Sequence, residues 1–499
     1  MKQKTPPSSP PRLSDRFLEW YCHPDFIEEI QGDLYERFRK QVRERGIPYA
    51  RFMFAWNVLR FFRPSCIKSF QPLTSTIMWN NYVKMGIRNI VKHYGVALLN
   101  IFGLTIGLAT CFFILLWVRD ELSVDRYHEN GPELYQVMRN MKANGEIFTT
   151  PAAPQPMEAA LVEKYPEVVR SSVFSWEEEA VITYKEKTFR EKGRFAGQSF
   201  FEMFSYPLLI GNPNKVLEDP ANVLVSETLA QKLFGSNWRT ENLALGQVVE
   251  LNIDTFRAFT VAGVFQDIPP NSRHQFDLVL SQEVFNVRNS WIDYWDNNRY
   301  RMFVQLQPGT DLDNFNQRIK SLIREHVPEE QVDVFLQKYG DGYLYGDFYE
   351  GKVTGGRIEY VRIFLVVGLF IFLIACINFM NLSTAQASIR AKEIGIRKTI
   401  GAKRAQIISQ FISESVLLAL LSLVLSGILI TILLPYFNEL TGKVLAVDFF
   451  DPKLLLGAVG LSLFMGLLAG SYPAFVLSSL KETQVLKGIL LPRSHASSV

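Results

Sequence analysis

Four long apolar runs divide this chain, and each is as long as the roughly 20 residues that a helix needs to cross a bilayer. The runs are residues 95–118, 363–389, 415–434 and 454–480, and the first contains no charged residue. A buried helix of a soluble protein rarely carries apolar residues on every face, as these runs do. The pattern therefore predicts an α-helical integral membrane protein with four transmembrane helices.

The basic residues of the connecting segments predict the orientation of these helices, because Lys and Arg gather in short loops on the cytoplasmic side. Segment 390–407 carries six basic residues, whereas segment 435–453 carries two. Three more directly precede the first run: Lys84, Arg88 and Lys92. We expect the N-terminus, segment 390–407 and the tail 481–499 in the cytoplasm, with 435–453 as a short loop on the opposite side. Residues 119–356 then form one large extracytoplasmic domain.

The segments before the first run have patterns of their own. Residues 1–11 are polar and rich in proline, which predicts a disordered tail and not a signal peptide. Residues 12–70 predict a small all-α cytoplasmic module, because apolar residues recur at helical spacing over 27–42 and the pattern stops at Gly46. Residues 79–94 mix apolar and basic positions, which is typical of an interfacial helix, although a solvated linker has the same composition.

The extracytoplasmic domain has the mixed pattern of an α+β fold. Ser226 is suited to cap a helix over "ETLAQKLF", with Gly235 just past its end. "VVELNI" and "AFTVAGVF" predict the two strands of a hairpin around Asp254. A further helix over "DNFNQRIKSLIREHV" would present three apolar residues on one face: Phe315, Ile319 and Ile323.

Composition and motifs argue against several functions. The net charge of +3 is too small to indicate a nucleic-acid partner. None of the four cysteines lies within 119–356, there is no CxxC pair and the histidines are scattered, so we expect neither a disulfide in that domain nor a metal site. No GxxxxGK[ST] motif is present, so the chain itself is expected to bind no ATP and no other cofactor.

No enzyme is predicted either, because no nucleophile–base arrangement can be identified. "SSLK" at 478–481 matches S-x-x-K, but it lies at the end of a span without a supporting motif. Asp267 and Asp277 have no partner that the sequence identifies, and we expect both to be ordinary surface acids. We therefore assign no catalytic residue.

Segment 390–407, "RAKEIGIRKTIGAKRAQI", is more elaborate than a turn between two spans needs to be. If it is helical, five apolar residues lie along one stripe: Ile389, Ile396, Ile400, Ile407 and Phe411. Such a stripe could fill a cleft on a partner protein. The basic residues could equally hold the segment on anionic lipid, and the residues alone favour neither interpretation.

Small and polar residues within the spans predict close helix packing. Two GxxxG pairs are present, Gly103 with Gly107 and Gly466 with Gly470. Asn378 and Asn381 lie near the inner end of the second run, where hydrogen bonds between helices of a dimer explain them better than contact with a substrate does.

Several stretches together resemble a known family. "GIRNIVKHYGVALLNIFGLTIGLA" with "DELSVDRYHEN", then "FFEMFSYPLLIGNP", "VLVSETLAQKLFG" and "FTVAGVFQDIPPNSRHQFD", resemble the MacB/FtsX-like ABC transporter permeases of the Bacteroidetes type. "LIACINFMNLSTAQASIRAKEIGIRKTIGA" is similar to their FtsX-type membrane module and is the most specific match. "DRFLEWYCHPDFIEEIQGDLYERF" resembles a prefix domain found before some such permeases.

This resemblance implies a location and a mechanism. The chain would lie in the bacterial inner membrane, form a homodimer and bind a separate cytoplasmic ABC ATPase that consumes the ATP. Motion of the periplasmic domain would then serve export or the handling of lipoproteins or peptides, with a possible periplasmic adaptor. The alternative is an FtsX-like regulator that relays the state of the ATPase to a periplasmic enzyme such as a cell-wall hydrolase.

The resemblance also implies a role for the 390–407 segment as the element that couples to the ATPase. The residues that match are Glu393, Ile394, Gly395, Ile396, Arg397, Lys398, Ile400 and Gly401. Members with the prefix domain usually carry a second copy of the periplasmic and membrane modules. The present sequence is therefore expected to be either a half-size permease or the first half of an eight-span protein.

Overall fold

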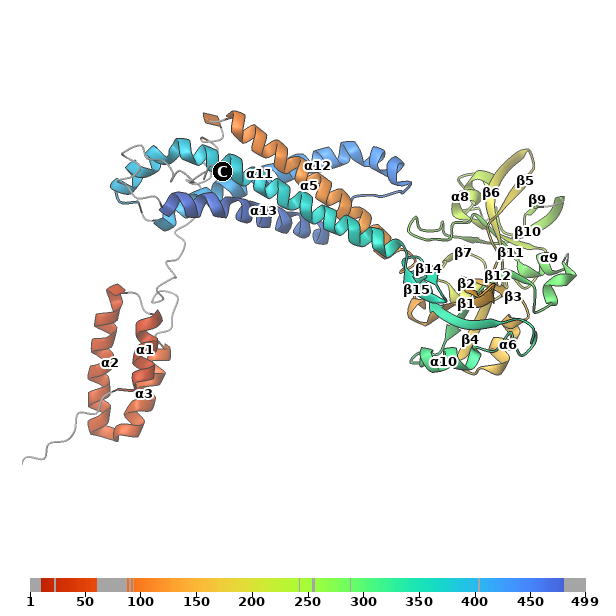
Figure 1. Cartoon of the computed structure of the whole chain (residues 1–499), viewed down its shortest axis with the longest axis horizontal. Helices are drawn as coiled ribbons and strands as arrows, with labels where there is room; N and C mark the ends of the chain where they lie inside the picture. The colour runs from red at the N-terminus through yellow and green to blue at the C-terminus, as the bar shows by residue number, and fades with distance from the viewer. Residues whose placement is uncertain are drawn as a thin grey trace, which may run out of the picture. The chain divides into compact units, whose positions relative to one another are not determined.

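The computed structural model of the chain describes residues 10–21, 24–60, 88, 91–92, 94–241, 243–253, 256–287, 289–402 and 404–479 (Figure 1). It divides into two compact units, one of residues 1–104, 376–423 and 456–499 and the other of residues 105–375 and 424–455. Four predictions lie largely or wholly outside the described residues: the tails 1–11 and 481–499, the interfacial helix 79–94 and the end of the N-terminal module at 61–70.

Within residues 10–60, three helices form a small bundle: α1 (Arg12–Tyr21), α2 (Pro24–Arg45) and α3 (Ile47–Arg60). Their core consists of buried apolar side chains from all three helices: Leu18, Leu34, Phe38, Ala50, Phe54 and Val58. The rings of Phe38 and Phe54 meet edge to face with their centroids 5.7 Å apart. Gly46 has φ +86°, which L side chains rarely adopt, and it makes the turn between α2 and α3.

The described residues include four helices that are long and apolar enough to cross a membrane. They are α5 (Tyr94–Ser123), α11 (Arg357–Thr399), α12 (Arg404–Thr441) and α13 (Pro452–Ser479). Each of them extends beyond its apolar run at one end or both, because helical hydrogen bonding continues into polar sequence where the hydrophobic pattern has ended. α12, for example, continues beyond the third run through Pro435 to Thr441, while the limits of the span within this helix stay a prediction.

An α+β domain lies between α5 and α11 in the chain, as predicted (Figure 1). Its main strands are β1 (Leu134–Ala143), β2 (Glu146–Thr150), β3 (Ala152–Pro154), β4 (Val168–Phe174), β5 (Glu178–Tyr184), β6 (Lys187–Ala196), β7 (Leu208–Ile210), β8 (Asn222–Ser226), β9 (Val248–Asn252), β10 (Phe256–Phe265), β11 (Leu278–Ser281), β12 (Asn298–Leu306) and β13 (Val332–Lys338). β14 (Asp347–Tyr349) and β15 (Lys352–Gly355) form a separate hairpin. The helices are α6 (Met157–Lys164), α7 (Phe200–Met203), α8 (Glu227–Phe234), α9 (Gln282–Asn286) and α10 (Leu312–Ile319).

The thirteen main strands form one sheet, with the order β11-β8-β10-β9-β5-β6-β4-β12-β1-β13, and β2, β3 and β7 each pair with one of these strands. β11 also pairs with β6 in parallel, so β6, β5, β9, β10, β8 and β11 form a closed ring. Alternate residues of β8 enter two different buried clusters, since Val223 and Val225 pack with α8 and Leu224 packs with α7. Both faces of this strand are therefore covered.

Two local predictions in this domain are confirmed. Ser226 caps α8, with its Oγ accepting from the Leu229 N–H at 3.2 Å, and the helix ends at Gly235, which has φ +94°. β9 and β10 pair antiparallel as a hairpin, with Phe256 opposite Asn252. The turn residues 254–255 of this hairpin lie outside the described residues.

Two other predictions need correction. The helix expected over 313–327 ends at Ile319, and the chain continues in turns in which the Val327 N–H still bonds to the Ile323 carbonyl. Asp267 is exposed, as predicted, whereas Asp277 is half-buried, and both have partners at the start of α8 that the sequence did not identify. Asp267 accepts from the backbone and the hydroxyl of Thr228, and Asp277, whose pKa is raised by burial, accepts from the Ser226 hydroxyl. These contacts depend on loops that sequence patterns do not place.

A buried carboxyl group joins α6 to α9. Glu158 Oε2 accepts from Gln282 Nε2 at 3.1 Å, and burial raises the pKa of Glu158 to about 7. Because this pKa exceeds that of an unfolded glutamate, the folded state holds a proton that the unfolded state has lost between about pH 4.5 and pH 7. Stability contributed by the protonated group is therefore lost as pH rises through 7.

We expect Glu158→Gln to stabilise the α+β domain at pH 8.5 by about 2 kcal/mol, because glutamine needs no buried charge at that pH. At pH 4 the wild-type carboxyl is protonated in the folded state and mostly protonated in the unfolded state, so the two proteins should differ little in stability. Hydrogen exchange of the β4 amides in the full chain at both pH values measures the difference. Glu250→Gln, at an exposed position of β9, serves as the control and should show no such dependence on pH. An equal effect of Glu158→Gln at both pH values would contradict the buried titration.

Candidate functional site

The expected coupling segment 390–407 is not one helix. α11 continues to Thr399, residues 400–402 turn, and α12 begins at Arg404. Gly401 has φ +101°, a conformation that favours glycine, and this residue permits the reversal. The prediction of a single stripe from Ile389 to Phe411 is therefore wrong. We call residues 390–411, with the turn at their centre, the elbow.

The inner side of the elbow packs on α13. Ile394 of α11 is buried with Ile407 and Phe411 of α12 against Ala474. Two further contacts attach the elbow to Ser478 near the end of α13. Lys398 Nζ donates to the Ser478 carbonyl at 2.8 Å, and Arg404 Nε donates to the Ser478 hydroxyl at 3.2 Å. Ser478, the serine of the S-x-x-K match, is thus a hydrogen-bond partner at a helix end.

The outer side of the elbow presents two isoleucines. Ile396 is 46% exposed and Ile400 is 81% exposed, and the Ile400 N–H bonds to the Ile396 carbonyl, so they lie one helical turn apart. Gly395 is buried, whereas the side chains of Glu393 and Arg397 are outside the described parts. The structure therefore directs Ile394 inward and Ile396 and Ile400 outward.

The glycines of the two GxxxG pairs lie where helices of this chain approach each other. A Cβ on Gly103 would lie 3.0 Å from Asn378 Nδ2, and one on Gly107 would lie 2.6 Å from Ala375 Cβ. Gly466 and Gly470 approach α12 in the same way, with the Ser415 hydroxyl 2.6 Å from a Cβ at Gly470. Asn378 and Asn381 are exposed on α11 in the single chain, so their hydrogen bonds in a dimer stay a prediction.

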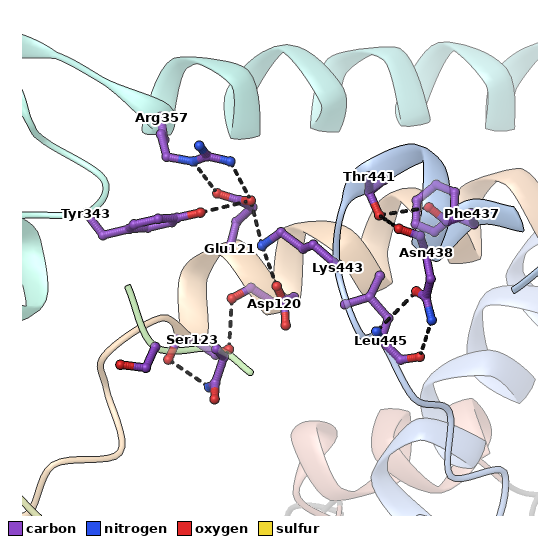
Figure 2. Close-up of polar contacts among 12 residues, drawn as sticks. Asp120, Glu121, Ser123, Tyr343, Arg357, Phe437, Asn438, Thr441, Lys443 and Leu445 are labelled. Atoms are coloured by element: carbon purple, nitrogen blue, oxygen red, sulfur yellow. Dashed lines mark hydrogen bonds and ion pairs between the residues drawn. The ribbon is translucent and has the colours of Figure 1, made fainter. Parts of the chain in front are cut away.

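At the opposite end of α11, five side chains converge on the end of α5, as Figure 2 shows. Arg357, the first residue of α11, binds both carboxylate oxygens of Glu121, from Nε at 3.1 Å and from Nη2 at 3.2 Å. Lys443 Nζ lies 2.7 Å from Glu121 Oε1 and also contacts the Asp120 carboxylate. Tyr343 donates its hydroxyl to Glu121 Oε1 at 3.3 Å. We call these five residues the outer junction.

Burial makes the outer junction costly to break. Glu121 is 0% exposed. Next to it, four apolar side chains from α5, from α11 and from the loop before α11 pack together: Val118, Leu344, Ile358 and Val361. The loop that carries Lys443 is itself fixed, because the Asn438 side chain both donates to and accepts from the Leu445 backbone (Figure 2). Arg357 is 51% exposed, so losing its pair with Glu121 should cost less than the roughly 3–5 kcal/mol that is typical of a fully buried pair.

A second ion pair follows directly where α5 ends. Asp125 has φ +58°, which is uncommon for a residue other than glycine. Its Oδ1 accepts from the Arg273 N–H at 3.1 Å and from the Ser272 hydroxyl at 3.2 Å, and its Oδ2 lies 2.8 Å from Arg273 Nε. The Arg273 guanidinium lies 4.2 Å from the centroid of the Tyr339 ring. We call Asp125, Ser272 and Arg273 the domain joint.

Neither of these two clusters is predicted from the sequence. The available signal is that charged residues of opposite sign stand after the first and third apolar runs and before the second. The domain joint connects "DELSVDRYHEN" to "IPPNSRHQFD", two of the stretches on which the family resemblance rests. Neither stretch by itself indicates that the other is its partner.

The chain matches two family models. The MacB-like periplasmic core domain matches residues 97–322, and the FtsX-like permease C-terminal domain matches residues 365–481. The ABC transporter permease YknZ of Bacillus subtilis is 22% identical over 418 residues, which are 81% of this chain and 98% of YknZ. The macrolide export ATP-binding/permease protein MacB of Bdellovibrio bacteriovorus is 24% identical over 319 residues, which are 61% of this chain and only 45% of MacB.

A solved structure is similar to part of this chain. It is the periplasmic region of MacB from Actinobacillus actinomycetemcomitans, which is 16% identical, with a TM-score of 0.31, over 42% of this chain and 90% of that one.

Proposed function

We propose, from the premise that this chain belongs to the family of MacB/FtsX-like ABC transporter permeases, that it couples the ATP hydrolysis of a separate ATPase to motion of its periplasmic domain. The observation that carries this proposal is the continuity of α11. This helix of 43 residues begins with Arg357 at the outer junction and ends at the elbow. At 1.5 Å per residue it is about 65 Å long, enough to reach from one side of a bilayer to the other.

Each end of α11 has the properties that such a link needs. At the elbow, Ile396 and Ile400 are free to enter an apolar cleft on the ATPase, while Ile394 and Lys398 attach α11 to α13. At the outer junction, the two hydrogen bonds from Arg357 to Glu121 fix α11 to α5. A displacement of the elbow would therefore move the start of the periplasmic domain.

The rest of the assembly follows from the family. We infer a homodimer in the bacterial inner membrane, with the elbow in the cytoplasm and the α+β domain in the periplasm. ATP is then bound by the ATPase subunit and not by this chain. The work done by the moving domain is export or the handling of lipoproteins or peptides.

The test is to co-express the chain with an ABC ATPase subunit from the same genome and to purify it through a tag on the chain. We expect the ATPase to be retained and the chain alone to hydrolyse no ATP. In the same cells, a cysteine at Val287, which is exposed in the α+β domain, should react with an impermeant maleimide, and one at Ile400 should not. ATP turnover by a preparation free of any ATPase, or labelling at Ile400 with protection at Val287, would contradict the proposal.

A further inference from the structure

Helix α3 of the N-terminal module has two apolar faces, and only one of them belongs to the core of the module. Ala50, Phe54 and Val58 are buried against α1 and α2. On the opposite face, Phe52 is 68% exposed and Trp56 is 57% exposed, one helical turn apart. Tyr49, three residues before Phe52, is exposed as well, so the three rings form one aromatic stripe. Within residues 10–60, the rings of this stripe are not part of the buried core, so the folding of the module does not account for them.

Positive charge surrounds the start of this stripe. Residues 37–60 contain seven basic residues and a single acid, Glu44. Arg37 is exposed and pairs with Asp33, and five further exposed basic residues gather where α2 ends and α3 begins: Arg39, Lys40, Arg43, Arg45 and Arg51. Arg45 also contacts the stripe itself, because its Nη1 donates to the Tyr49 hydroxyl at 2.9 Å and its guanidinium lies 5.1 Å from the centroid of the Tyr49 ring. We call these five cations the basic corner.

We propose that the aromatic stripe and the basic corner of α3 bind the surface of a membrane that contains anionic phospholipid. Tyr and Trp side chains lie preferentially at the level of the lipid head groups, where the ring is apolar and its polar atom stays hydrated. Each basic side chain close to an anionic surface strengthens the association about five-fold. A helix with one aromatic face bordered by arginine is the usual form of such a contact.

The position of the module in the chain favours lipid over a soluble partner. Residues 61–93 connect α3 to α5, and a segment of this length reaches at most roughly 110 Å when fully extended. The bilayer that α5 crosses is therefore always within reach of the stripe, at a high effective concentration. A contact too weak to hold a separate protein suffices under these conditions. This inference does not depend on the proposed coupling to an ATPase.

Photo-crosslinking of the full chain in nanodiscs tests the proposal. The photoreactive residue p-benzoylphenylalanine replaces Phe52 in one protein and Glu36, an exposed residue of α2, in the other. We expect lipid adducts at position 52 at several times the yield at position 36. The yield at 52 should rise when phosphatidylglycerol is added to nanodiscs of phosphatidylcholine, and high salt should reverse that increase.

Charge variants separate the basic corner from the overall charge of the module. Arg43→Gln together with Arg45→Gln should lower the lipid adducts at position 52 about five-fold or more, whereas Arg16→Gln on α1 should leave them unchanged. All three arginines are exposed, so the module should fold in each variant. Equal lipid yields at 36 and 52 would overturn the proposal. Adducts to the chain itself or to a second copy in place of lipid would also overturn it, and would make the stripe a protein contact.

Discussion

Replacing Ile396 and Ile400 together by aspartate is expected to weaken the binding of the ATPase at least 100-fold. Burying an unpaired carboxylate in an apolar cleft costs several kcal/mol, and about 4 kcal/mol is half the binding free energy of a micromolar complex. Both isoleucines are exposed, so the fold and the membrane insertion of the variant should be intact. Retention of the ATPase on the tagged chain and stimulated ATP hydrolysis are the measurements.

A matched control places the same charges elsewhere. Phe148 and Val287 are exposed apolar residues of the periplasmic domain, and aspartate at both positions should leave the binding of the ATPase unchanged. If the elbow is instead held on anionic lipid, glutamine at Arg397 and Lys403 should have a larger effect than aspartate at the two isoleucines. Normal retention of the ATPase by the Ile396→Asp/Ile400→Asp variant would remove the elbow from the coupling mechanism.

The features that the sequence predicted correctly are those that are determined by residues close together in the chain. The four apolar helices, the cap at Ser226 and the hairpin of β9 and β10 each depend on residues that are close in the chain. The ends of the helices do not follow from the apolar runs, because helical hydrogen bonding does not end where hydrophobicity does. Pro435 illustrates this, since α12 continues six residues beyond it.

At the elbow, the backbone conformation of one glycine interrupts the helical stripe that the spacing of apolar residues predicts. The spacing of Ile396, Ile400 and Ile407 is that of a continuous helical stripe, but Gly401 reverses the chain between the second and the third. Ile407 is therefore buried, while Ile396 and Ile400 are exposed. A glycine is compatible with both a bend and a regular helix, so the sequence alone did not decide between them.

The outer junction could not be predicted from spacing at all. Glu121 and Arg357 are 236 residues apart, and Lys443 lies on a third segment. Their meeting depends on how α5 and α11 pack and on the conformation of the loop after α12. A charge at the end of an apolar run is usually a hydrated anchor, so nothing in the sequence separated these residues from Arg119 or Lys453.

Replacing Asp125 by alanine is expected to lower the stability of the periplasmic domain by about 3–5 kcal/mol, which is the usual cost of leaving one partner of a buried pair alone. Burial raises the pKa of the Asp125 carboxyl, whereas Arg273 beside it acts in the opposite direction, so the carboxylate depends on that partner. In the variant the Arg273 guanidinium would keep its contacts with Tyr339, at the backbone carbonyl and the ring. Alanine is also unsuited to the φ of +58° at this position.

Two further variants show whether the charge of Asp125 or only its packing is responsible for this loss of stability. Asp125→Asn keeps an oxygen that can accept from the Arg273 N–H and tolerates the left-handed backbone, so it should lose about half as much stability as the alanine variant. Asp296→Ala, at an exposed position of the same domain, should lose almost none. Hydrogen exchange of the full chain gives the stability, and the ATPase assay gives the coupling. Because the elbow is unchanged, Asp125→Ala should still bind the ATPase. Loss of that binding would mean that the domain joint stabilises the membrane helices themselves and not their connection to the periplasmic domain.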